Sequence, residues 1–509
     1  MHFPFSSAAS YPRAASINPM NEHHDLAALI RADTPLLAID THEELEVIAA
    51  FQRALAASLR PLYAWSITTG LRRLDMDTGA KPMSSGEVLD AIRDTRQKSV
   101  FLLLDYSPFL RYVVTLRQLR EIAIRQGVAA HTIALVGANL DLPKELDALA
   151  VRFSLSLPNE VELDKIVREE ANAYSREHAG KRVQIHASAL KAVVRNLKGL
   201  AGTDARRIAR RIIATDGMIT DADLPAVAKA KFELLNKAGV LSFEYEPIAF
   251  QDVAGLRRLK RWIEQRRAVF MGEPTKVPLD PPKGLLLLGV QGTGKSLAAK
   301  AVAGGFQVPL LRMDMASIYN KYHGETEKNL RESLGNAEVM APCVLWIDEI
   351  EKAFATSDSD GGTSQRILGY FLTWMAERKG KIFLVATANA IDSLPPELLR
   401  KGRFDEIFFV DLPVEDIRRE LFRLHLSKRG LKPEDFDLAE LAAVADGFSG
   451  AEIEQGVVSA LYAAHGEGAA LDQRHLVDEL RHTRPLSVVM AEKVARLRAW
   501  AAERTVPAD

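Results

Sequence analysis

The sequence predicts an α/β fold made of two modules in tandem, and three observations support this prediction. An apolar strand, a glycine-rich loop and a helix-forming run follow one another at 284–303. A further apolar strand ends in two acids at 344–349. Strands of the same kinds recur in the same order in the first half, beginning with SVFLLLDYSPFL at 99–110. Apolar strands alternating with helix-length segments are typical of parallel sheets covered by helices.

Bulk composition narrows the class of protein. The 509 residues include 66 basic and 67 acidic side chains, so the formal charge of -1 gives no general reason to bind nucleic acid or an anionic membrane. The sequence contains no apolar run near the roughly 20 residues of a membrane helix. Its single cysteine, Cys343, excludes disulfides within the chain and favours a reducing, cytoplasmic setting.

The opening 20 residues are rich in Ser and Ala and contain no acid. They have no apolar core of the kind that a secretory signal needs. We expect a disordered leader here, or a start placed ahead of the true one at Met20.

The loop at 289–296 matches G-x-x-x-x-G-K-S between a strand and a helix, which is the context that this phosphate-binding motif requires. Its glycines let backbone N–H groups turn inward around phosphate oxygens, and the helix adds its positive end. Lys295 can reach the β and γ phosphates, and Ser296 can offer a hydroxyl to Mg²⁺. The expected contact residues are Gly289, Val290, Gln291, Gly292, Thr293, Gly294, Lys295, Ser296 and Leu297.

Two later strands end in polar side chains suited to the chemistry of a bound nucleotide. Asp348 can hold Mg²⁺ through water, while Glu349 can polarise the attacking water. The strand KIFLVATANAI at 381–391 ends at Asn389, a neutral amide that can orient water or sense the γ phosphate. Ligands lie at such carboxyl ends in open parallel sheets, so we expect the three side chains to meet.

These elements, in this order, resemble an AAA+ ATPase of the classical AAA clade. The resemblance covers about 244–480 and rests on DVAGLRRLK, PPKGLLLLGVQGTGKS, NKYHGETEKNLR, VLWIDEIEKA, VATANAIDSLPPELLRKGRFD and DGFSGAEIEQ. It implies ATP and Mg²⁺ as ligands and a three-layer αβα core with a helical lid. It also places Asp252 and Gly255 beside the adenine, with Gly450 and Ala451 closing over it from the lid.

The resemblance implies further roles that depend on an assembly. Arg403 matches the first arginine finger, on a segment with Arg400 that faces the neighbouring subunit in such proteins. An arginine delivered in trans would neutralise charge on the γ phosphate. Glu406 stands where many relatives carry a second arginine. Tyr322 occupies the position of the central-pore loop, where an aromatic residue can grip an extended polypeptide.

The first half repeats this order of elements without the phosphate loop. TPLLAIDTHEELEVIAAF at 34–51 offers no glycine or lysine, and Glu43 and Glu44 at the helix start would repel phosphate while satisfying the helix dipole. Tyr106 replaces the catalytic glutamate, so we assign Asp105 and Asn139 structural roles. The basic stretch at 206–211 is interpreted as a solvated or intersubunit face, with binding of an acidic partner or RNA as the alternative.

The whole chain apart from its leader resembles an AAA family first known as a hypothetical chloroplast reading frame and shared with bacteria. We expect five segments: a leader at 1–20, a degenerate AAA-like α/β domain at 21–180, a lid-like helical subdomain at 181–240, an AAA+ core at 244–414, and a helical lid with C-terminal helices at 415–509.

The leading functional hypothesis is an ATP-hydrolysing protein that forms a homo-oligomeric, hexameric ring and remodels a protein client or works through an adaptor. One alternative is an ATP-dependent switch or assembly scaffold with slow turnover. A second is an ATPase that handles nucleic acid, against which the charge balance argues. The absence of H-E-x-x-H excludes a fused zinc protease of that type.

Overall fold

The chain folds into two compact units, residues 1–219 and 220–509. The structure is a computed structural model that describes residues 22–76, 79–124, 129–138, 140–178, 180–236, 240–244, 248, 250–315, 325–353, 363–378 and 380–509. The leader expected at 1–20 lies outside the described residues. Among the described helices, none combines the length and the apolar character needed to cross a membrane.

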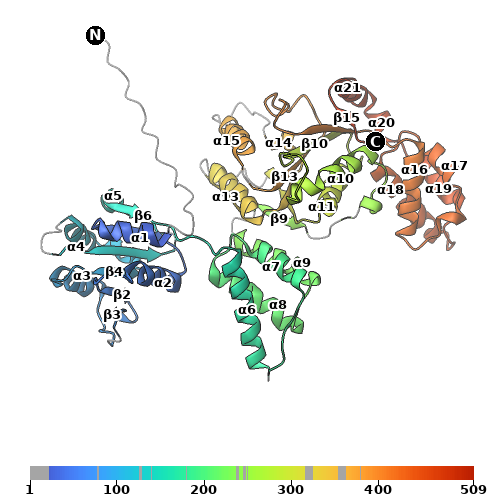
Figure 1. Ribbon diagram of the computed structural model, residues 1–509. Helices are drawn as coiled ribbons and strands as arrows, with labels where there is room; N and C mark the ends of the chain where they lie inside the picture. The colour runs from blue at the N-terminus through green and yellow to red at the C-terminus, as the bar shows by residue number, and fades with distance from the viewer. Residues whose placement is uncertain are drawn as a thin grey trace, which may run out of the picture. The chain divides into compact units, whose positions relative to one another are not determined.

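The first unit contains a sheet with the strand order β3-β2-β4-β5-β1-β6. Figure 1 labels β2, β3, β4 and β6 of this sheet. The strands are β1 (Leu36–Asp40), β2 (Leu62–Ser66), β3 (Gly70–Arg73), β4 (Val100–Leu104), β5 (Thr132–Gly137) and β6 (Ala150–Arg152). The hairpin partner β3 runs antiparallel to β2, whereas the other neighbours are parallel. When the five strands other than β3 are numbered in chain order, their order across the sheet from β6 to β2 is therefore 5-1-4-3-2.

Helices cover both faces of this sheet and create two apolar layers. The helices are α1 (Glu22–Arg31), α2 (Glu44–Leu55), α3 (Ser85–Asp94), α4 (Val113–Ile124) and α5 (Lys144–Asp147), with the short turn η1 (Ser107–Arg111). Phe51 from α2 packs in the layer on one face. Trp65 and Tyr106 pack in the layer on the other, with their rings edge to face. The result is a three-layer α/β arrangement.

A helical subdomain completes the first unit. Its elements are α6 (Glu160–Glu177), β7 (Gln184–Ile185), α7 (Ala187–Leu197), α8 (Gly202–Asp216) and β8 (Met218–Ile219). The basic residues of α8 are largely paired: Arg206 and Arg210 both bond to the buried Glu170 of α6. Arg207 pairs with Asp204. Most of this stretch is therefore neutralised locally, which fits a structural role better than a free basic surface.

The second unit contains a sheet with the order β15-β14-β10-β13-β12-β11-β9. The strands are β9 (Leu241–Glu244), β10 (Gly284–Gly289), β11 (Leu310–Met313), β12 (Cys343–Ile347), β13 (Ile382–Ala388), β14 (Glu406–Val410) and β15 (Val506–Pro507). Among the described strands of this second sheet, only β9 is antiparallel to its neighbour. When the five central strands are numbered in chain order, their order from β14 to β11 is again 5-1-4-3-2. This is the order of the first unit, and it confirms the predicted P-loop-type α/β core.

Two apolar layers enclose this second sheet as well. One layer holds α10 (Arg257–Met271) and α11 (Lys295–Phe306), where Phe270 and Phe306 pack on Phe383 of β13. The other holds α9 (Leu224–Leu235), α13 (Glu325–Met340), α15 (Thr363–Glu377) and α21 (Ala491–Ala501). Further short elements are η2 (Asp221–Asp223), η3 (Phe250–Asp252), α14 (Ile350–Ala353) and α20 (Leu486–Val489).

A helical lid follows the core and has an apolar cluster of its own. It consists of α16 (Glu415–Ser427), η4 (Pro433–Asp435), α17 (Leu438–Val444), α18 (Gly450–Gly466) and α19 (Gln473–His482). Ser449 begins α18 with a capping box, because its side chain accepts from the N–H of Glu452 while the Glu452 carboxylate accepts from the N–H of Ser449. This cap fixes where Gly450 and Ala451 start the helix.

Helix α9 carries a buried lysine against the ATPase core. Lys231 is 2% exposed, and its ammonium donates to the carbonyl of Val339 at 2.6 Å. Asn336 of α13 bonds in turn to the carbonyl of Leu235. Burial lowers the pKa of Lys231 from the ordinary 10.5 to about 8.

We predict that Lys231→Met stabilises the second unit near pH 7 and that its advantage shrinks as pH rises. Between about pH 8 and 10.5 the unfolded chain holds a proton that the folded one has lost, so wild-type stability increases with pH across this window. The charged form costs the fold about 3 kcal/mol at neutral pH, partly offset by the hydrogen bond. Melting curves at pH 7 and pH 9.5 measure this difference.

Lys229→Met is the matched control, because Lys229 lies exposed on the same helix. Its effect should be small and independent of pH. Equal shifts for both variants at both pH values would contradict a buried, desolvated ammonium at Lys231.

Candidate functional site

The glycine-rich loop lies between β10 and α11 at the carboxyl edge of the sheet and can approach a phosphate chain closely. Gly292 and Gly294 adopt φ of +81° and +92°, which side chains other than glycine rarely tolerate. A Cβ on Gly289 would lie 2.1 Å from the carbonyl oxygen of Val410. Glycine is therefore required at Gly289 for the packing of β10 on β14, and at the other two positions for the turn of the loop.

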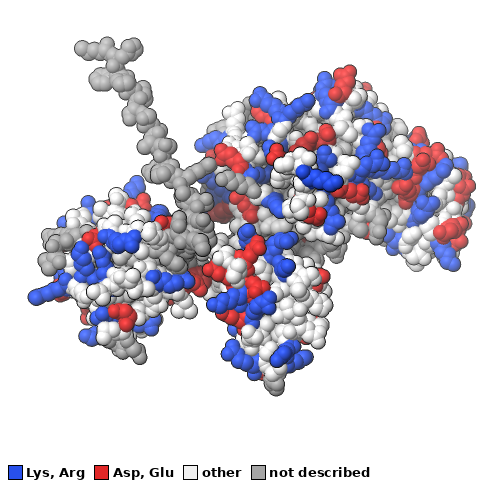
Figure 2. Space-filling model, in the orientation of Figure 1, with Lys and Arg blue, Asp and Glu red and all other residues white. Residues whose placement is uncertain are grey.

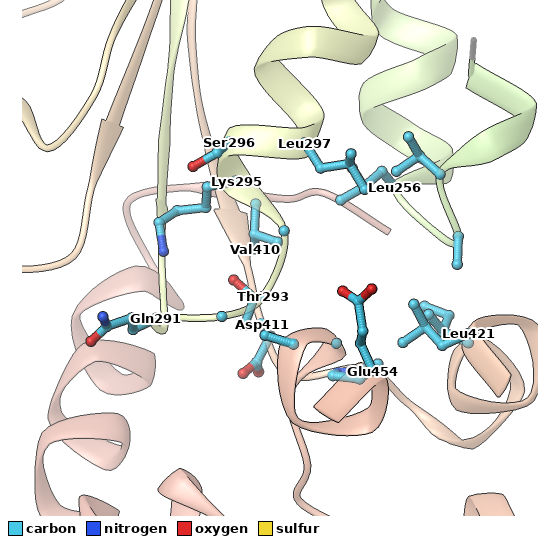
Figure 3. A pocket seen from close by; sticks show the side chains of 18 of the residues that line it. Leu256, Gln291, Thr293, Lys295, Ser296, Leu297, Val410, Asp411, Leu421 and Glu454 are labelled. Atoms are coloured by element: carbon cyan, nitrogen blue, oxygen red, sulfur yellow. The ribbon is translucent and has the colours of Figure 1, made fainter. Parts of the chain in front are cut away.

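Lys295 projects its ammonium into the loop that precedes it (Figure 3). The side chain is 6% exposed and donates to the carbonyls of Gly289 at 2.9 Å and Val290 at 2.7 Å. Burial lowers its pKa to about 8, and the negative charges of Glu351, Asp348 and Glu349 oppose that effect. Phosphate oxygens placed here would favour the charged ammonium in the same way.

The two acids predicted after β12 lie beside the loop and are held by neighbouring strands. Asp348 Oδ1 accepts from the Thr387 hydroxyl at 2.6 Å, and Oδ2 pairs with Arg312 at 3.2 Å. Glu349 accepts from the Asn389 amide at 2.9 Å and pairs with Lys352. The structure thus brings together the predicted metal-binding acid, the predicted base and the predicted sensor.

Three residues that sequence reasoning missed support these acids. Thr387 precedes Asn389 by two positions on β13, and its hydroxyl also accepts from the backbone N–H of Glu349. Arg312 is held over the ring of Trp346, 4.8 Å from the ring centre. Glu351 is 6% exposed and accepts from the N–H of Asn389 at 2.8 Å. Burial raises the pKa of Glu351, while that N–H lowers it.

The acids and the loop line one end of a cavity of about 470 Å³. The opposite end is formed by Val253, Ala254, Leu256, Ile417 and Leu421, with Gly450 and Ala451 of the lid alongside. Glu454 of α18 points into this space (Figure 3). The lid contacts the loop directly, because the N–H of Ala451 donates to the carbonyl of Gly292 at 3.1 Å. A nucleoside with a phosphate chain fits this elongated space between core and lid.

The remaining predicted residues differ in how they relate to the cavity. Gln291, Gly292, Thr293, Gly294, Ser296 and Leu297 line it, whereas Gly289 and Val290 lie behind the loop. Asp252 is exposed and does not line it. Gly255 is adjacent to lining residues, and its N–H donates to Glu420 at 3.2 Å. The roles given to these residues stay predictions.

The donor set suits ATP with Mg²⁺. The Ser296 hydroxyl and the Asp348 carboxylate, both lining the same end of the cavity, are hard oxygen ligands of the kind that Mg²⁺ prefers beside phosphates. Across the described residues, no group of three or more His, Cys, Asp or Glu forms a site that the protein could fill with a metal by itself. Mg²⁺ would therefore be held jointly by these two side chains, water and the nucleotide.

The residues predicted to act between subunits are only partly described. Arg403 is half-buried, and one of its terminal nitrogens donates to the carbonyl of Leu372 at 2.8 Å. Arg400 is exposed. Tyr322, predicted for the pore loop, lies outside the described residues.

The first unit uses the corresponding edge of its sheet differently. The Glu43 carboxylate accepts from the N–H of Thr203 at 3.2 Å and from the Thr203 hydroxyl, at the start of α8. It makes no side-chain cap on its own helix, whose first turn carries Glu44 and Glu46. The favourable effect of acidic charge on this helix dipole stays a prediction. Thr203 is the second residue of α8, just as Ala451 is the second of α18. In the first unit the Glu43 carboxylate thus joins the loop after β1 to the helical subdomain. In the second unit the corresponding contact is made by the main chain, from Ala451 to Gly292.

In the first unit, core structure occupies the position that corresponds to Glu349, the predicted base. Asp105 and Asp348 are the first residues beyond β4 and β12, so Tyr106 corresponds to Glu349. Tyr106 is fully buried and donates to the carbonyl of Ser85 at 2.5 Å. Burial and the charge of Asp105 raise the pKa of Glu44. This acidic edge disfavours phosphate. Asn139 lies outside the described residues.

Comparison with known proteins identifies the family. Residues 22–155 match the SpoVK-like AAA ATPase N-terminal domain, 161–238 its second domain, and 285–412 the ATPase family associated with various cellular activities (AAA). An AAA domain-containing protein ycf46 of Pyropia yezoensis is 34% identical over 490 residues, which cover 95% of this chain and 98% of that protein. The chain belongs to the ycf46 family of AAA proteins. The predicted resemblance is confirmed.

Other relatives place this ycf46-family chain among AAA ATPases more widely. The ycf46 protein of Guillardia theta is 35% identical over 491 residues, covering 94% of each chain. A proteasome-activating nucleotidase of Aeropyrum pernix is 35% identical over 281 residues, which are 53% of this chain and 67% of that protein. The similarity to the nucleotidase is therefore partial, whereas that to ycf46 proteins extends through both units.

We predict that Lys295→Ala weakens ATP binding to the full chain about 100-fold or more, because it removes a charge-assisted contact to phosphate. Calorimetric titration measures the affinity and the number of ATP molecules bound per chain. Lys300→Ala is the matched control, since Lys300 lies on the same helix but pairs with Glu244 outside the cavity. Tight residual binding by the Lys295 variant would indicate a second site and contradict the account of the first unit.

We predict that Glu43→Ala frees the start of α8 from the first sheet. Loss of the carboxylate removes both hydrogen bonds that the exposed Thr203 makes to it, which should destabilise this contact by at most about 1 kcal/mol. Hydrogen exchange at residues 202–206 should accelerate several-fold. Glu46→Ala, an exposed acid on the same helix, should leave exchange there unchanged.

Proposed function

We propose that this protein hydrolyses ATP in an oligomer and uses the cycle to remodel a protein partner. The observation that supports hydrolysis best is the contact between Glu349 and Asn389, beside a lysine-bearing phosphate loop. A carboxylate held in place at this edge can take a proton from water, while the neighbouring amide fixes its direction. Binding alone does not need this second acid.

The site residues divide the work of the reaction. Lys295 and the loop N–H groups bind phosphate, and Ser296 with Asp348 would hold Mg²⁺, which supplies positive charge between the phosphates. Thr387 and Arg312 keep Asp348 oriented, because both of its oxygens are bonded. Glu349 then accepts the proton of the attacking water. Access of that water between core and lid depends on how α18 meets the loop at Gly292.

Oligomer formation follows in this proposal from the need for positive charge on the far side of the γ phosphate. Arg403, carried over from the family resemblance, would supply that charge to a neighbouring subunit, and a head-to-tail interface of this kind closes into a ring. Similarity to a proteasome-activating nucleotidase supports work on protein substrates. Tyr322 would contact the substrate in the pore.

A nucleotide-dependent switch or scaffold is the second candidate function. Its support is that Arg403 bonds to Leu372 of its own chain and that Glu406 stands in place of a second arginine. Slow turnover would then reset an assembly. Binding of nucleic acid has less support, since acidic and basic side chains are intermixed across the visible face (Figure 2).

We predict that ATP turnover per chain rises with protein concentration and falls about 100-fold or more in both Glu349→Gln and Arg403→Ala. Lys401→Ala, an exposed cation on the same segment, is the control and should retain activity. Steady phosphate release across a hundredfold dilution series measures this. Turnover that is negligible at every concentration, despite ATP binding, would favour the switch.

A further inference from the structure

The chain segment at 505–509 lies at the end of the cavity opposite the phosphate loop. Its strand β15 pairs parallel with β14, opposite Phe408 and Phe409. The N–H of Ala508 donates to the carbonyl of Phe409 at 2.9 Å, and the carbonyl of Ala508 accepts from the N–H groups of Arg258 and Leu259 at 3.0 and 3.1 Å. Ala508 is 2% exposed. The segment is therefore fixed between the sheet edge and the start of α10.

This anchoring places the Asp509 side chain among the residues that line the cavity. Its Oδ1 accepts from the N–H of Arg257 at 3.2 Å. In the part of the chain that the structure describes, Oδ2 accepts no hydrogen bond from protein. A Cβ added to Gly255 would lie 3.1 and 3.2 Å from the two carboxylate oxygens, so the carboxylate lies directly against Gly255.

The surroundings of Asp509 suit a flat heterocycle. Val253, Ala254 and Leu256 come from the core side, and Ile417 and Leu421 come from the lid side. Such apolar walls can sandwich a base, leaving its polar edge to be recognised by a few polar groups. The nearby N–H of Gly255 is already bonded to Glu420. Asp509 supplies an acceptor at this end that is not fully used by the protein.

We propose that Asp509 selects adenine by accepting a hydrogen bond from its exocyclic amino group. At neutral pH a carboxylate can only accept, whereas hypoxanthine presents a carbonyl oxygen at the position of that amino group. Two acceptors facing each other repel and leave both desolvated. The inference rests on the proposed function, because it assumes that the cavity binds a nucleotide with its base at this end.

Asp509→Asn in the full chain tests the proposal, with any affinity tag placed at the other end. Asparagine has the same shape, can still accept from Arg257 and can also donate to a carbonyl. Calorimetric affinities for ADP and IDP avoid turnover and differ in the base alone. We expect wild type to prefer ADP and the variant to lose about tenfold of that preference.

Glu503→Gln is the control, because it removes an exposed carboxylate close by in sequence that does not line the cavity. It should keep the wild-type preference. Asp509→Ser serves as a second variant that retains a small acceptor for α10, in case the asparagine variant does not fold. It should lose the preference as well.

The outcomes separate this inference from the function on which it rests. An unchanged preference in a folded Asp509 variant, or equal binding of ADP and IDP by wild type, overturns the inference and leaves nucleotide binding intact. Wild type that binds neither diphosphate overturns both. If Glu503→Gln also lost the preference for ADP over IDP, the effect would come from a general loss of negative charge, and this result would contradict the proposal.

Discussion

A buried ammonium at the end of β10 is the interaction on which the ATPase unit depends. Lys295 can lie there because Gly289 lets β10 pack closely on β14 and because the carbonyls of Gly289 and Val290 accept its protons. Three acids that follow β12, Asp348, Glu349 and Glu351, act on it with their negative charge at the same sheet edge. Opposite charges concentrated at this low-dielectric edge need fixed partners, which the neighbouring strands supply.

The first unit shows what the same strand order does without that lysine. Its sheet repeats the order of the second, but Glu43 bonds to the start of α8 and a buried tyrosine stands at the position of Glu349. A fixed carboxylate holds loop and lid together with no need of a ligand. The chain thus combines one module whose loop and helical subdomain are joined by a side-chain contact with one whose lid borders a nucleotide-sized cavity.

Much of this organisation was readable in the sequence, because glycines and a lysine at fixed spacing and acids at strand ends mark both topology and chemistry. The α/β class, the tandem repeat of elements, the phosphate loop and the meeting of Asp348, Glu349 and Asn389 were predicted from such local patterns, whereas the order of the strands across each sheet was not. Arg312 and Asp509 were not, since a residue's partner across the sheet depends on long-range register that no local motif records. The partner of Glu43 was not predicted for the same reason, because it lies 160 residues away.

In the proposed function each site is completed by an arginine from another chain, and complementation between two inactive variants tests this directly. Glu349→Gln lacks the base but keeps Arg403, whereas Arg403→Ala keeps the base. Mixed at equal amounts and allowed to exchange subunits, they should recover up to about a quarter of wild-type ATP turnover, because random assembly pairs an intact base with an intact arginine at that share of interfaces. Turnover that stays at the sum of the separate variants, in mixtures shown to co-assemble, would contradict the account.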